Sequence, residues 1–203
     1  MDCEVIKNNF SVYTDVFDGY LEEKVDLDII IPDYCAAAIK ILDCDLTPII
    51  TSAVIESDRF IVEGVCTANV MYIDEQSGMV KSIEESTPFT RVSPLDNNLE
   101  NNRIKIKLRT SNVICRLLNS RRISVKTVVG LAVKISGNKH CELTTDFDNC
   151  NIETKNKLFS GNIYVNSACS NMQIGSELHT QSPVCEIIKT SSNIFLNDIK
   201  VIP

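Results

Sequence analysis

Basic and apolar residues alternate strictly over residues 103–109, and this pattern limits the possible folds more than any other stretch of the chain. A period of two places the basic side chains on one side of a β-strand and the apolar ones on the other. A second, longer alternating run covers residues 122–135, after the turn formers Asn119 and Ser120. The two runs predict an antiparallel hairpin with one apolar face, and that face needs a second sheet to cover it.

The rest of the chain predicts further strands, separated by polar breaks, and one short helix. Pro32 ends a strand because it has no amide hydrogen to donate, and Asp33 can cap a helix after it. Three consecutive alanines favour that helix over about residues 34–42. Polar stretches at residues 15–18 and 136–138 are expected to interrupt or end strands. The expected strands cover residues 2–14, 20–31, 46–55, 60–73, 79–89, 103–115, 122–135 and 158–165.

These elements predict a mainly β protein, an antiparallel sandwich-like domain of long hairpins with one short helix at about 34–42. A similar spacing of apolar residues returns near the C-terminus, after Ser182 and Pro183, and predicts the start of a second copy of the unit. The expected organisation is a β domain over residues 1–137, a linker with one strand over 138–175, and an incomplete second unit over 176–203.

The net charge of −7 hides a strong asymmetry along the chain. Residues 1–100 carry 20 acidic and 6 basic residues, whereas residues 101–140 carry 10 basic residues and no acidic one. One interpretation is that basic strands lie beside acidic strands in one sheet and form cross-strand pairs. The other is a bipolar surface for self-association or docking. The candidate interaction surface consists of Arg103, Lys105, Lys107, Arg116, Arg121 and Arg122.

No stretch of the sequence predicts catalysis, a cofactor or a metal site. The chain has two histidines and seven glycines, and it lacks the glycine-rich phosphate loops and the nucleophile motif of hydrolases. None of the nine cysteines form CxxC pairs, and without a secretory signal we expect reduced, mostly buried thiols. The sequence leaves open whether any of these cysteines form cross-links. No aromatic residue interrupts the basic run and the pI is near 4.9, so nucleic-acid binding is not favoured. No apolar run reaches the ~20 residues of a membrane helix.

A set of short motifs spread over the first two thirds of the chain carries a family resemblance. They are Leu27-Asp28-Ile29, Pro32-Asp33-Tyr34-Cys35, Ile41-Leu42, Pro48-Ile49-Ile50-Thr51-Ser52, Asp58-Arg59, Val62-Glu63-Gly64, Tyr72-Ile73-Asp74 and residues 115–126 (CRLLNSRRISVK). Together they resemble the SPOCS domain family, the repeated module of spore-coat morphogenetic proteins in anaerobic endospore-formers. Ala36 departs from the pattern, where the family usually has proline. No LysM module follows, so we expect a truncated chain or a short paralogue.

The resemblance implies a non-enzymatic module of endospore coat assembly, acting by protein–protein contacts in the mother-cell cytoplasm and at the spore surface. Its implied partners are spore-coat or forespore-surface proteins, with self-association as a further option and no small-molecule substrate. The alternative is a carbohydrate- or cell-envelope-binding β module. That function would need exposed aromatic residues, and most of the five tyrosines and seven phenylalanines lie in apolar runs.

Overall fold

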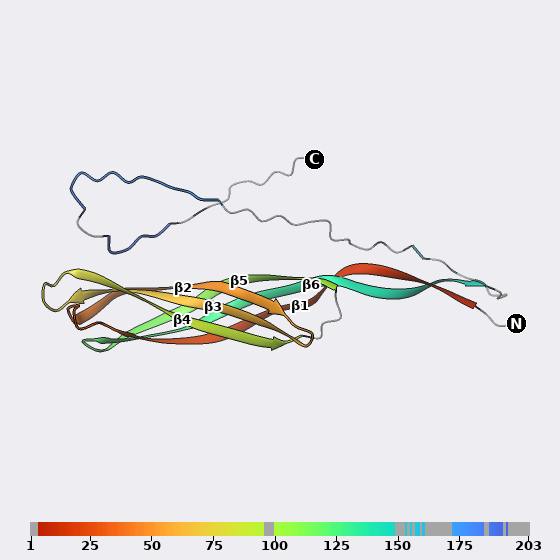
Figure 1. Cartoon of the computed structure of the whole chain (residues 1–203), viewed down its shortest axis with the longest axis horizontal. Helices are drawn as coiled ribbons and strands as arrows, with labels where there is room; N and C mark the ends of the chain where they lie inside the picture. Colours follow the sequence, from red (N-terminus) through yellow and green to blue (C-terminus); the bar gives the residue numbers. More distant parts are fainter. Residues whose placement is uncertain are drawn as a thin grey trace.

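The described residues form six long strands, arranged as two antiparallel three-stranded sheets (Figure 1). The computed structural model describes residues 4–95, 100–148, 153, 155, 157, 158, 160, 172–184, 187–192 and 194. The strands are β1 (Glu4–Ile30), β2 (Ala38–Ile55), β3 (Arg59–Asp74), β4 (Val80–Pro94), β5 (Glu100–Asn119) and β6 (Arg122–Asp148). The predicted mainly β, antiparallel fold is therefore confirmed.

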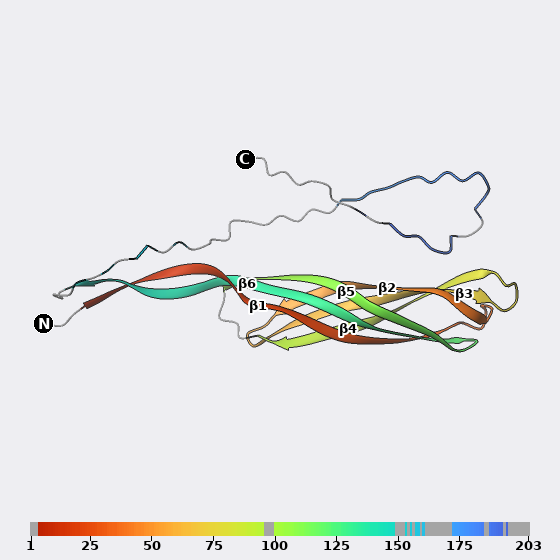
Figure 2. The ribbon, with the colours of Figure 1, turned by 180° about the vertical axis from the view of Figure 1, so that it is seen from behind.

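One sheet has the order β1–β6–β5 and the other the order β2–β3–β4, so that β6 and β3 are the central strands. Figure 2 shows β5, β6 and β1 running beside one another. The hairpin predicted from the two alternating runs is present, with Leu117 opposite Ile123 next to its turn. β1 pairs with β6 along almost its whole length, from Glu4 opposite Asp148 to Ile30 opposite Arg122.

The core lies between the two sheets, and the central strands β3 and β6 contribute most of its fully buried side chains. Their inward residues are fully buried, whereas the apolar residues of the edge strand β5 are only partly buried against the same core. The side of β6 predicted to face inward does so. The fully buried core side chains of β3 and β6 are Phe60, Val62, Cys66, Val70, Ile123, Val125, Val129, Leu131, Val133 and Ile135.

The helix predicted at about 34–42 is wrong, and the described part of the chain contains no helix at all. Instead, Cys35 closes a turn by donating its amide hydrogen to the Pro32 carbonyl at 2.9 Å. Ala38 is already in β2, with 3% of its surface exposed, and its amide donates to the Ser120 carbonyl at 2.7 Å. Strand pairing and burial at this position outweigh the helix preference of alanine, which amounts to only a few tenths of a kcal/mol per residue.

Two polar stretches that were expected to end strands do not end them. Residues 15–18 form an irregularity in the pairing between Asp15 and Phe17, and β1 continues through it. β6 continues through residues 136–138 as far as Asp148. Beyond the start of β5, which pairs with β6 as far as Asn138, residues 4–12 of β1 and 139–148 of β6 form a two-stranded arm that projects from the sandwich (Figure 1).

The predicted division into a β domain, a linker and a second unit stays a prediction. The expected strand at 158–165 and much of 176–203 lie outside the described residues, and residues 172–184 and 187–192 are irregular. No helix long and apolar enough to span a bilayer occurs in the described parts of the chain.

Candidate functional site

Acidic residues of β1 and basic residues of β6 pair across the outer face of the β1–β6–β5 sheet. Inward apolar residues alternate with these charges on both strands, so the charges all point to the same, outer side. The contacts are Arg122–Asp28 (2.5 Å), Lys126–Asp26 (3.3 Å), Lys134–Asp15 (2.7 Å) and Lys134–Asp18 (3.6 Å). The interpretation of the charge asymmetry as cross-strand pairing is therefore confirmed for these two strands.

These contacts move the pKa values of the groups in the expected directions. The hydrogen bond from Arg122 lowers the pKa of the Asp28 carboxyl, and those from Lys134 and Ser136 lower the pKa of Asp15. The Asp15 carboxylate in turn raises the pKa of Lys134. The side chains of the Arg122–Asp28 and Lys134–Asp15 ion pairs are about half exposed, so each pair contributes little to stability.

The cations of β5 are in a different position, because β6 separates them from the acids of β1. Lys105 lies opposite Lys134 and Lys107 lies opposite Ala132, so neither meets an acid across the strand pair. We call Arg103, Lys105, Lys107, Arg109 and Arg116 the basic edge; all five are exposed and lie on the edge strand β5. Apart from Arg103, none of them makes an ion pair with a described residue.

A tyrosine lies next to the basic edge on the same outer face. The Tyr20 ring occupies the space in front of Gly130, where a Cβ atom would otherwise be. Gly130 lies opposite both Glu22 and Arg109, and Tyr20 is 57% exposed. Across the outer face, the outward side chains therefore change from mainly acidic on β1 to basic on β5, with the exposed Tyr20 ring between them.

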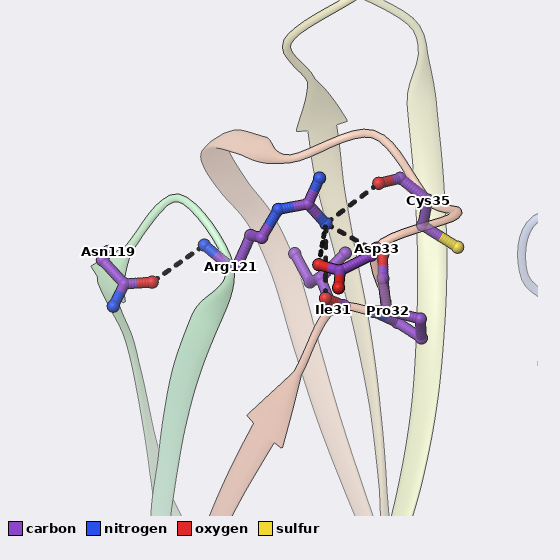
Figure 3. A network of polar contacts seen from close by, with 6 residues as sticks. All are labelled: Ile31, Pro32, Asp33, Cys35, Asn119 and Arg121. Carbon is purple, nitrogen blue, oxygen red and sulfur yellow. Dashed lines mark hydrogen bonds and ion pairs between the residues drawn. The ribbon is translucent and has the colours of Figure 1, made fainter.

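Arg121 has a structural contact that separates it from the other basic residues. It lies in the turn between β5 and β6, and its guanidinium reaches the loop between β1 and β2 (Figure 3). There its Nη1 atom donates to the carbonyl oxygens of Pro32 at 2.9 Å and Cys35 at 3.1 Å, with Ile31 at 3.4 Å. The Asp33 carboxylate lies 3.8 Å away and is fully exposed. One arginine thus fixes the loop that holds the Pro-Asp-Tyr-Cys motif.

The six predicted surface residues therefore fall into two groups. Arg103, Lys105, Lys107 and Arg116 share the exposed outer face of β5. Arg121 and Arg122 lie at the end of the hairpin, where one holds the β1–β2 loop and the other pairs with Asp28. The role of Arg121 was not predicted, because nothing in the sequence shows that a residue 89 positions after Pro32 touches it.

A second polar site lies on the β2–β3–β4 sheet, where residues 187–190 pass over it. Lys189 reaches the carboxylates of both Asp43, at 2.5 Å, and Asp45, and these contacts raise the pKa of Lys189. Next to this contact is a cleft of about 320 Å³, whose lining includes Thr67, Asn69 and Glu84. No group of three or more metal-ligating residues occurs among the described residues. The lysine neutralises the acids that could otherwise bind a cation.

Comparison with known proteins gives one match, to a domain family. Residues 38–118 match the family model described as "SipL, SPOCS domain". No curated protein and no solved structure matches the chain. The matched stretch runs from the first residue of β2 almost to the end of β5, so it includes the whole β2–β3–β4 sheet and the basic edge. The family resemblance predicted from the motifs is confirmed over these residues.

Proposed function

Because residues 38–118 match the SPOCS domain family model, we propose that this chain is a non-enzymatic building block of the endospore coat that acts by protein–protein contacts. Its proposed partners are spore-coat or forespore-surface proteins, and it would meet them in the mother-cell cytoplasm and at the spore surface. The basic edge is the surface proposed to bind them.

The uncompensated charge of Lys105, Lys107, Arg109 and Arg116 is the observation that supports this proposal. On β6, by contrast, Arg122, Lys126 and Lys134 each pair with an acid of β1. On β5, Lys105, Lys107, Arg109 and Arg116 add positive charge that no described acid neutralises. A row of like charges costs stability through mutual repulsion, and binding an acidic partner would relieve that cost.

The spacing of the row fits an extended acidic segment. Alternate residues on one side of a strand are about 6.6 Å apart, so Lys105, Lys107 and Arg109 present cations at regular intervals along the edge. An extended segment with acids at every second position has the same repeat. β5 is also an edge strand of its sheet, and such strands accept added strands.

The test is an affinity pull-down from sporulating cells with identification of the bound proteins by mass spectrometry. The bait is the whole chain, compared with a Lys105→Glu/Lys107→Glu/Arg116→Glu variant. A matched control changes the same amount of charge at exposed positions away from β5, as Lys24→Glu/Lys40→Glu/Lys139→Glu.

We expect coat proteins to bind the parent chain and the control, and to be lost from the β5 variant. Equal recovery by both variants would remove the basic edge from the proposed mechanism. Recovery of no coat protein, together with retention of the parent chain on isolated peptidoglycan, would instead favour envelope binding.

A further inference from the structure

Two cysteines from different sheets meet along one flank of the sandwich. Cys44 lies in β2, at the edge of one sheet, and Cys115 lies in β5, at the edge of the other. Both thiols are partly buried against the shared core. The two strands come within 8 Å of each other between Cα atoms, and Ala38 at the start of β2 is hydrogen-bonded to the carbonyl of Ser120, just after β5.

Cys44 follows Ala38 by six residues and Cys115 precedes Ser120 by five, so the two cysteines lie at the same level along the two strands when counted from that hydrogen bond. The interaction between their thiols lowers the pKa of Cys115 and raises the pKa of Cys44. A thiolate is the form that attacks a disulfide, so Cys115 is the more reactive member of the pair. Both cysteines are only partly buried, so a small-molecule disulfide can reach them from solvent.

We propose that Cys44 and Cys115 form a reversible disulfide that joins the two sheets of the sandwich. With a small-molecule disulfide such as oxidised glutathione, the Cys115 thiolate attacks one sulfur and releases one glutathione thiolate. Cys44 then loses its proton to solvent and attacks the Cys115 sulfur, which releases the second glutathione. Two protein thiols are thereby oxidised, and one glutathione disulfide is reduced to two glutathione molecules.

The other cysteines of the described core do not offer this chemistry. Cys66 is fully buried, and burial raises the pKa of its thiol to about 11, so it is an inert core residue. Cys35 lies in the loop held by Arg121 and Cys141 lies in the arm, and neither has a thiol contact like that of the pair. Among the five described cysteines, oxidation is therefore expected to join Cys44 to Cys115.

The proposed bond would join covalently two sheets that are otherwise held together on this flank by packing and by the Ala38–Ser120 hydrogen bond at its end. It would close a loop containing β3 and β4, and closing a loop of roughly 70 residues removes much of the freedom of the unfolded chain. For a chain of this size we expect a rise in Tm of about 10 °C on oxidation. The prediction is independent of any binding by the basic edge.

The test oxidises the whole chain with oxidised glutathione at pH 8, blocks the remaining thiols and maps peptides without reduction. Trypsin places Cys44 in residues 41–59 and Cys115 in residues 110–116, and each of these peptides contains no other cysteine. We expect these two peptides to be linked in the monomer, with a Tm that falls again after reduction. Cys44→Ser and Cys115→Ser should abolish both the link and the Tm change, whereas the control Cys141→Ser should keep both.

Three results would overturn the proposal. The first is that both peptides carry the blocking group or glutathione while no link between them forms. The second is a link that joins two copies of the chain instead of closing within one. The third is an internal link that leaves Tm unchanged or lowers it, since this would mean that the native geometry does not accommodate the bond.

Discussion

Removing the Arg121 side chain tests how the hairpin turn stabilises the loop of the Pro-Asp-Tyr-Cys motif. Two of its contacts, to the carbonyls of Pro32 and Cys35, lie within normal hydrogen-bond distance, and the third, at 3.4 Å, is too long to contribute much. A hydrogen bond from a charged donor contributes about 1.5–3 kcal/mol. Because the side chain is 38% exposed, the lower end of that range applies to each of the two good bonds.

The two bonds together then contribute about 3 kcal/mol to the free energy of unfolding. In the truncated variant, water can hydrogen-bond to the freed carbonyls, and we take this to compensate about a third of the loss. The exposed Asp33 contact adds nothing measurable. Two backbone bonds survive in the variant, from Ile31 to the Arg121 carbonyl and from Ala38 to the Ser120 carbonyl. We therefore expect Arg121→Ala to lower the free energy of unfolding by about 2 kcal/mol, which is a fall in Tm of about 6 °C.

Urea unfolding followed by circular dichroism measures this loss in a chain that has no tryptophan. Arg121→Lys should recover about half of it, because one ammonium cannot reproduce the fork of the guanidinium. Arg116→Ala is the matched control, an exposed arginine on the same hairpin, and should change stability by less than about 0.5 kcal/mol. Equal unfolding free energies for Arg121→Ala and Arg116→Ala would refute the reasoning.

Two further substitutions test the packing of the second sheet and its turn. At Gly64 a Cβ atom would lie 2.5 Å from the backbone oxygen of Ile49, which can move away only by shifting the strand. Gly64→Ala should therefore lower the free energy of unfolding, measured in urea, by about 2–3 kcal/mol. The control Gly175→Ala should leave it almost unchanged, because a Cβ atom there would meet nothing within 4 Å. Hydrogen bonds from Ser77 lower the folded-state pKa of Asp74 below its unfolded value of 3.8. That stabilisation is present above pH 3.8 and is lost as the pH falls through the folded pKa, so the urea midpoint of the parent chain should fall more steeply between pH 4 and 2 than that of Asp74→Asn. Parallel pH profiles would show that the Asp74 turn contributes no pH-dependent stability.

The strands could be predicted because their signal is local. The alternation of apolar with polar or charged residues over 103–109 and 122–135 reflects one inward and one outward side of each strand. In the structure the apolar side of both strands faces the core. The sandwich followed from the need to cover those two apolar faces. The family resemblance depended on short motifs, and these lie mostly within the matched residues 38–118.

The incorrect predictions share a cause, which is that long-range pairing decided the outcome. Three alanines favour a helix in isolation, but Ala38 gains a strand partner and donates a hydrogen bond to the Ser120 carbonyl in the distant hairpin turn. Residues 136–138 look like a strand end, yet β1 pairs with β6 through them, and Ser136 donates to the Asp15 carboxylate at 2.6 Å. Likewise, the contacts of Arg121, Lys189 and the Cys44–Cys115 pair join residues far apart in sequence.

The two-stranded arm has a geometric consequence for whatever adjoins this fold. The first described residue, Glu4, pairs with Asp148, so both ends of the six-strand unit leave from the tip of the arm. Nine residues of extended strand span about 30 Å, so this exit point lies well clear of the sandwich. Any segment that adjoins the six strands would therefore be attached to the sandwich through the arm, at a distance set by the length of the arm.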